Sequence, residues 1–125
     1  MIPKFRAWLK EENKMIEPSD ILSISFKLCE MTPNYLYGFE KEKYDFYDLE
    51  LMQSTGLKDK NNKEIFEGDI VLVLDSPYTV FYDNERGSYR LKPHDDRWNV
   101  DYMSNFSHSG NFEVVGNIYE NKEYL

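Results

Sequence analysis

The sequence is poor in cysteine, histidine and long apolar runs. Of its 125 residues, one is cysteine and two are histidine. A lone cysteine excludes a disulfide within the chain, and we interpret Cys29 as a small buried residue of a protein in a reducing compartment. No apolar run approaches the roughly 18 residues that cross a bilayer, and charge interrupts the N-terminus before a signal-peptide core forms. The sequence therefore predicts a cytoplasmic protein that does not enter the membrane.

Positive charge is also scarce. The chain has 15 basic and 23 acidic residues, a formal net charge of −8 and a pI near 4.7. Such a charge repels a phosphate backbone, so we expect no nucleic-acid partner. The densest basic stretch, residues 57–63, contains an acid and is typical of a polar turn. The same acidity leaves open the alternative of a decoy that imitates nucleic acid and occupies a basic host protein.

Motifs for catalysis, cofactors and metals are missing as well. His94 and His108 lie in polar segments near Asp95, Asp96 and Asp101, but their spacing matches no metal motif. No nucleotide-binding glycine pattern, nucleophile motif or zinc-protease motif occurs. We predict no catalytic residue, no cofactor and no metal site, and therefore no enzyme. An unrecognised enzyme that uses scattered carboxylates stays an alternative.

Aromatic residues, in contrast, are abundant. Ten tyrosines and eight phenylalanines help to bring the aromatic fraction to 16% and the apolar fraction to 41%. This composition predicts a folded chain, and aromatic side chains favour the half-buried surface of a sheet. The length fits one domain, residues 1–125, and no segment keeps a helical period over the length of an ordinary helix. We predict a single-domain, all-β fold with at most a few short helices.

Alternation of apolar and polar residues predicts the strands of the N-terminal half. The predicted strands are residues 5–8, 15–16, 21–28 and 46–52, with a long loop over residues 30–45. The first two form a hairpin. In the third, alternation places the even-numbered apolar residues from Leu22 to Leu28 on one buried face. In the fourth, it groups Tyr47 with Leu49 and Leu51.

The C-terminal half shows clearer signals. Residues 64–74 predict a strong strand interrupted by a tight turn at Gly68, residues 79–91 a hairpin, and residues 112–115 a last strand. A glycine at such a turn favours a backbone conformation that other residues avoid. Strand position predicts five core residues in the whole chain: Trp8, Ile70, Leu72, Val80 and Val114.

Three blocks of sequence frame the chain: residues 2–8, 51–71 and 113–121. The central block has the form M-Q-x-T-G-L-x-D-x-x-x-x-x-I-x-E-G-D-I-V. On these blocks the chain resembles the YopX family of phage and prophage proteins. The resemblance implies a barrel-like sheet with SH3-like character, a bacterial host cell and no agreed activity, so it supplies no catalytic residues. Ser54 replaces an aromatic residue and Asn62 a glycine, but asparagine also tolerates a left-handed turn.

The central block also contains the candidate site. Its glycines and acids suit turns, which favours a structural interpretation. A second interpretation is a contact surface formed by its polar rim: Lys58, Asp59, Lys63, Glu67 and Asp69. Because tyrosine and tryptophan are abundant and catalytic motifs are missing, the leading hypothesis is a non-enzymatic protein-binding or assembly module. Its partner would be another protein or further copies of itself in a homo-oligomer.

Overall fold

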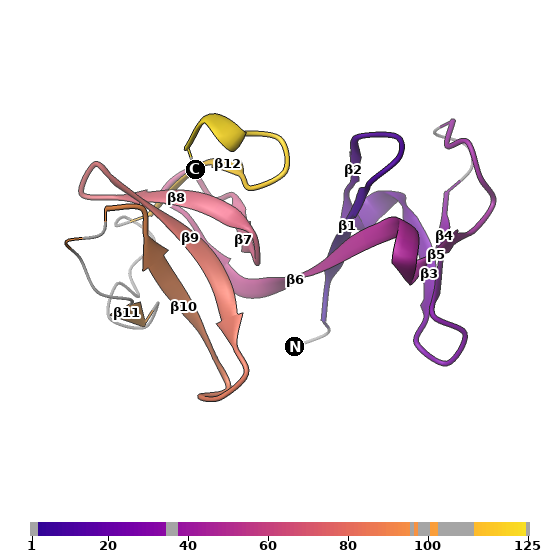
Figure 1. Cartoon of the computed structure of the whole chain (residues 1–125), viewed down its shortest axis with the longest axis horizontal. Helices are drawn as coiled ribbons and strands as arrows, with labels where there is room; N and C mark the ends of the chain where they lie inside the picture. The colour runs from indigo at the N-terminus through magenta and orange to yellow at the C-terminus, as the bar shows by residue number, and fades with distance from the viewer. Residues whose placement is uncertain (1–2, 35–37, 96, 98–100, 103–111, 125) are drawn as a thin grey trace. The chain divides into compact units, whose positions relative to one another are not determined.

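The computed structural model describes residues 3–34, 38–95, 97, 101–102 and 112–124. These residues form antiparallel strands, and their helices are 3₁₀ turns of three residues (Figure 1). The predicted all-β fold with short helices is confirmed. In this described part of the chain, no helix has the length and apolarity needed to cross a membrane.

The chain divides into two compact units, an N-terminal unit up to residue 53 and a C-terminal unit from residue 54. Strand β6 (Leu49–Lys58) contributes to both. In the N-terminal unit, β6 pairs with β1 (Phe5–Leu9), which pairs in turn with β2 (Lys14–Ile16). This confirms the predicted opening hairpin. Asn13 closes its turn with a φ of 54°, a left-handed conformation that asparagine tolerates.

A second sheet of the N-terminal unit has the strand order β3-β4-β5. Its strands are β3 (Ile21–Ser25), β4 (Glu30–Pro33) and β5 (Tyr44–Asp45). The short helix η1 (Pro18–Asp20) precedes this sheet, and η3 (Phe46–Asp48) follows it. Buried side chains from both sheets form one core: Ala7, Leu9, Ile16, Met31, Tyr44 and Leu49.

The predicted loop and the predicted fourth strand of this unit are wrong. The loop predicted over residues 30–45 contains β4 and β5, because Met31 and Tyr44 are buried and belong to the core. The strand predicted over residues 46–52 begins only at Leu49, since η3 occupies the first three positions.

The C-terminal unit contains a five-stranded sheet of order β11-β10-β9-β8-β12. Its strands are β8 (Asp69–Val73), β9 (Ser76–Asp83), β10 (Ser88–Pro93), β11 (Asp101–Tyr102) and β12 (Glu113–Asn117). The predicted hairpin is β9 and β10, and both it and the last strand are confirmed. The sheet curls like a half-barrel, which agrees with the predicted barrel-like sheet (Figure 1). Strand β7 (Glu64–Phe66) pairs with the second half of β6.

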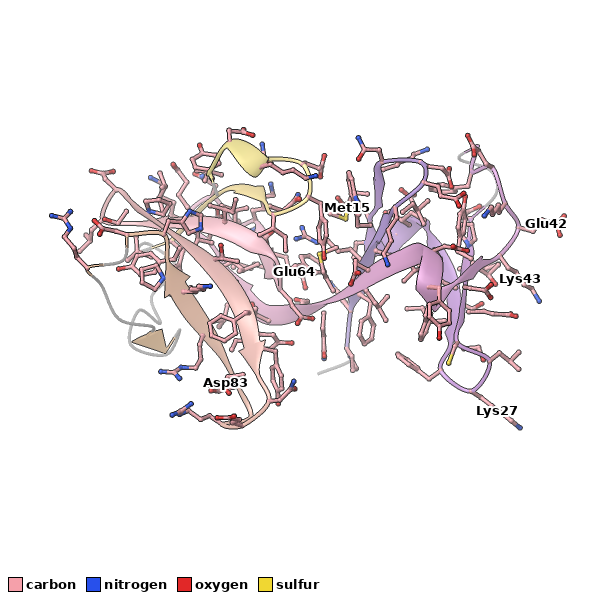
Figure 2. All side chains as sticks on the ribbon, in the orientation of Figure 1. Met15, Lys27, Glu42, Lys43, Glu64 and Asp83 are labelled. Carbon is pink, nitrogen blue, oxygen red and sulfur yellow. The ribbon has the colours of Figure 1, made fainter. Side chains whose placement is uncertain are left out.

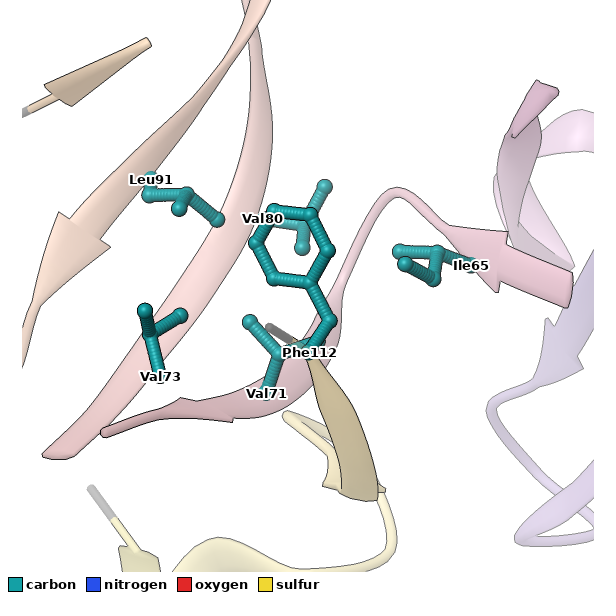
Figure 3. Close-up of a cluster of buried hydrophobic side chains, with 6 residues drawn as sticks. All are labelled: Ile65, Val71, Val73, Val80, Leu91 and Phe112. Atoms are coloured by element: carbon teal, nitrogen blue, oxygen red, sulfur yellow. The ribbon is translucent and has the colours of Figure 1, made fainter. Parts of the chain in front are cut away.

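One apolar cluster fills this unit (Figure 3). Its members are Ile65, Val71, Val73, Val80, Leu91 and Phe112. Of the five predicted core residues, Trp8, Ile70 and Val80 are buried, whereas Leu72 and Val114 are half-buried. Leu72 alternates with the two valines of β8 that enter the cluster, so its side chain lies on the other face of the sheet.

Candidate functional site

A buried carboxylate organises the turn between β6 and β7. Asp59 Oδ1 accepts the N–H groups of Asn61 and Lys63 at 2.9 and 2.8 Å. Its Oδ2 accepts the N–H of Val114 in β12 at 2.9 Å. Burial acts to raise the pKa of Asp59, but the three amide donors and the Lys63 charge outweigh it and hold the pKa below its usual value. One ionised side chain therefore joins the turn to a strand 55 positions away.

The turn between β7 and β8 confirms the prediction for Gly68. This glycine has a φ of 87°, its N–H donates to the carbonyl of Val80 at 2.8 Å, and its carbonyl accepts the N–H of Ile118 at 2.9 Å. The buried Asp69 follows it, and its Oδ2 accepts the N–H of Phe66 at 2.8 Å. The backbone at Gly68 thus connects three segments of the unit.

The two unusual residues of the central block have local partners. Ser54 is buried, its hydroxyl donates to the Glu64 carboxylate, and its Oγ accepts the N–H of Gly56 at 3.1 Å. Asn62 has a φ of 65°, which is the left-handed conformation expected at this position. Both substitutions are therefore compatible with the turn.

The contact surface predicted from the polar rim of this block needs correction. Asp59 and Asp69 are buried, and both accept hydrogen bonds from backbone amides, so their side chains are closed to a partner. Lys58 and Lys63 are exposed, and Glu67 is half-buried. The remaining rim is two lysines and part of one glutamate, and the structural interpretation of the block gains support.

His94 has both ring nitrogens engaged. Nδ1 lies 2.6 Å from the carbonyl oxygen of Tyr124 and must donate to it, and Nε2 lies 2.7 Å from Thr79 Oγ1. Among the described residues, no group of three or more His, Cys, Asp or Glu side chains is placed to hold a metal. His108 and Asp96 lie outside the described residues.

The N-terminal unit places large apolar side chains in solvent, which sequence analysis missed. Phe26 is 60% exposed, Leu28 62% and Tyr47 92%. Phe46 joins them, because its ring contacts Phe26 and it lines one hollow with Leu28 and Tyr47. We call these four residues the apolar surface. Contiguous exposed apolar groups mark interaction sites, whereas isolated ones are ordinary.

A turn at residues 26–29 creates this surface. The strand predicted over residues 21–28 ends at Ser25, whose Oγ accepts the N–H of Leu28 at 3.1 Å. Cys29 completes the turn with a φ of 54°, and its carbonyl accepts the N–H of Phe46 at 3.0 Å. Cys29 is exposed, so the prediction of a buried cysteine in a strand is wrong.

An irregularity in β3 explains why alternation misled us. The pairing of β3 with β4 shifts register between Ile21 and Ser23. Consequently Ile21 and Ile24, three positions apart, both pack against the core, and Leu22 is left largely exposed. Such a bulge changes which residues of a strand face inward. No glycine or proline marks it in the sequence of this strand.

Two open hollows accompany the apolar surface. The larger has a volume of about 530 Å³ and is lined by Leu28, Cys29, Asp45, Phe46 and Tyr47. The smaller has a volume of about 270 Å³ and is lined by Pro3, Lys4, Phe5, Pro18, Ile21, Ile24 and Phe26. The ring of Phe26 lies edge-to-face with Phe5 and Phe46, at centroid distances of 5.8 and 6.0 Å. These contacts orient Phe26 although most of it is exposed.

Two side chains of opposite charge, Lys27 and Asp45, lie beside the apolar surface. Lys27 lies at the tip of the turn between β3 and β4, and its side chain points away from the ribbon (Figure 2). The exposed Asp45 lines the larger hollow. The nearby Lys43 pairs with Glu30, with 3.8 Å between Nζ and Oε2. Within the residues that the structure describes, neither Lys27 nor Asp45 has an ion-pair partner.

Fold and site together define a small all-β protein with carboxylate-fixed turns and an exposed apolar surface. A family model described as YopX protein matches residues 4–125, and the chain belongs to the YopX family. It is also similar to the crystal structure of protein EF1440 from Enterococcus faecalis, with 27% sequence identity and a TM-score of 0.63 over 98% of this chain and 97% of that one. No curated protein matches the chain.

Proposed function

We propose that this chain is a non-enzymatic protein-binding or assembly module that acts in phage or prophage biology, in the cytoplasm of a bacterial host. Its contact surface is the apolar surface of the N-terminal unit. The observation that carries this proposal is the exposure of Phe26, Leu28 and Tyr47 beside an open hollow. The exposure of large apolar side chains to water is unfavourable. A partner that covers them removes this unfavourable hydrophobic free energy.

The composition of the surface supports binding. Aromatic residues are enriched in the buried centres of protein interfaces, and half of the apolar surface is phenylalanine with one tyrosine beside it. Asp59 and Asp69, the buried carboxylates of the central block, are committed to backbone amides, which favours a structural over a catalytic role. The phage setting rests on membership of the YopX family.

Affinity purification from the bacterial host tests the proposal. A tagged chain should retain a protein in stoichiometric amount, either an untagged copy of itself or a host or phage protein, and Tyr47→Ser should lose it. Leu74→Asn is the matched control, because Leu74 of the C-terminal unit is 86% exposed and its φ of 51° suits asparagine. The proposal is wrong if nothing is retained, or if Tyr47→Ser retains the same protein as the parent.

A further inference from the structure

We propose that a second copy of this chain occupies the apolar surface through a two-fold contact. The turn at residues 26–29 of each copy lies over the larger hollow of the other, and Lys27 of each copy faces Asp45 of the partner subunit. This inference rests on the proposed function, because it names the partner of the same surface.

A two-fold contact requires one patch to contain both a projecting part and a receiving part, since each copy presents the same residues. The apolar surface meets this condition. The turn projects Leu28 into solvent, and Phe46 and Tyr47 line the open hollow beside it. The hydrogen bond from the N–H of Phe46 to the carbonyl of Cys29, 3.0 Å long, holds the two parts next to each other. A volume of about 530 Å³ gives room for a leucine side chain and its neighbours.

The charges beside the apolar surface are also self-complementary, because one patch contains both a cation and an anion. The exposed cation of the turn, Lys27, and the exposed acid of the hollow, Asp45, would form two ion pairs per dimer, one on each side of the axis. Charge pairs at an interface fix orientation and exclude wrong partners. The surrounding Lys43 and Glu30 already pair with each other and do not compete.

The net charge of −8 opposes association of two copies at long range. Salt screens this repulsion over about 8 Å at physiological ionic strength, whereas the apolar contact acts only where the surfaces touch. We therefore expect the dimer to be weaker at low salt than at physiological salt.

Sedimentation velocity of the purified full chain tests the inference, with Lys27→Glu and Asp45→Lys as the probing variants. The parent should form a dimer in a concentration-dependent way. Each variant should raise the dimer dissociation constant at least about tenfold, because two pairs of like charges then face each other. An equimolar mixture of the two variants should dimerise again, since both pairs of facing charges are opposite in the mixed dimer. Lys92→Glu, the same change at an exposed lysine of the C-terminal unit, should leave the dimer intact.

Three results would overturn the inference: a parent that stays monomeric at submillimolar concentration, a dimer that persists in both variants, or a mixture that stays monomeric while each variant keeps the parent circular dichroism spectrum. A monomeric parent together with capture of a different protein that Tyr47→Ser loses would leave the proposed function standing, with another partner on the apolar surface. A monomeric parent that captures nothing would refute both.

Discussion

The two units of this chain differ in how completely they bury their aromatic and aliphatic side chains. In the C-terminal unit, Phe112 and the branched residues around it converge on one buried cluster, and Leu74 in a turn is the most exposed of the large apolar residues described there. In the N-terminal unit a core also forms, yet Phe26, Leu28 and Tyr47 remain in solvent beside a hollow. Under the proposed function, the C-terminal unit contributes mainly stability and the N-terminal unit the contact surface.

The largest expected difference between the units comes from one phenylalanine in each. Phe112→Ala should lower the free energy of unfolding by about 3–5 kcal/mol, because it empties the centre of a packed cluster. Phe26→Ala should cost less than about 1 kcal/mol in the monomer, because most of this ring is already in water. Urea unfolding of both variants, at a concentration where the parent is monomeric, measures the two costs. Equal losses of unfolding free energy in the two variants would contradict the proposed difference between the units.

Asp59 gives the next largest effect. Asp59→Asn should destabilise the chain by about 2 kcal/mol at neutral pH, since an amide nitrogen would face one of the N–H donors that the carboxylate now accepts. The lowered pKa of Asp59 means that its stabilisation is fully present above about pH 4 and is lost as the pH falls through the folded-state pKa. The difference between parent and variant in urea melts should therefore shrink at acid pH. A difference that stays constant from neutral to acid pH would contradict this role.

Gly68→Val should cost about 1–3 kcal/mol, because valine resists a φ of 87°. Gly38→Val is the matched change in the N-terminal unit, where the φ is 77° but a new Cβ meets nothing within 4 Å. Gly38 is exposed, whereas the backbone of Gly68 is bonded to two other segments. Thermal unfolding should rank Gly68→Val as clearly less stable than Gly38→Val. A Gly68→Val variant that melts with the parent would refute the account of this turn.

The smallest effect concerns alkaline pH. Burial raises the pKa of Tyr44 in the N-terminal unit to about 12, with help from its hydrogen bond to Glu12. A raised pKa contributes stability below the unfolded value of about 10, and that contribution is lost as the pH rises through the folded value. Tyr44→Phe should cost about 1 kcal/mol at neutral pH and less as the pH approaches 12. Urea melts of parent and variant at both pH values measure this, and an unchanged difference would contradict it.

The same contrast explains what could be predicted from the sequence. In the C-terminal unit, most apolar residues of the strand interiors face the buried cluster, so alternation and the Gly68 turn predicted β7 to β10 and β12 correctly. In the N-terminal unit, alternation assumes that apolar residues face inward, and that assumption fails for Leu22, Phe26 and Tyr47. Conflict between pattern and burial is expected at functional surfaces.

The burial of two acids in the predicted polar rim, Asp59 and Asp69, was missed for a related reason. In a sequence, acidic residues of a glycine-containing turn are expected to be exposed to solvent. Asp59, however, accepts an N–H from Val114 in a distant strand and is buried. That contact depends on tertiary structure, which local patterns do not contain. The unmarked bulge at Ile21 and Ser23 likewise hid the exposed side of β3.

The most direct test of the central claim is the reactivity of the Cys29 thiol, the one thiol in the chain. Cys29 lines the larger hollow, so a partner copy on the apolar surface should shield it. If two copies meet there, the rate of modification by a neutral thiol reagent falls as protein concentration rises, and Lys27→Glu keeps the fast rate at every concentration. A parent rate that is independent of concentration and equal to that of the variant would contradict the claim that two copies meet at this surface.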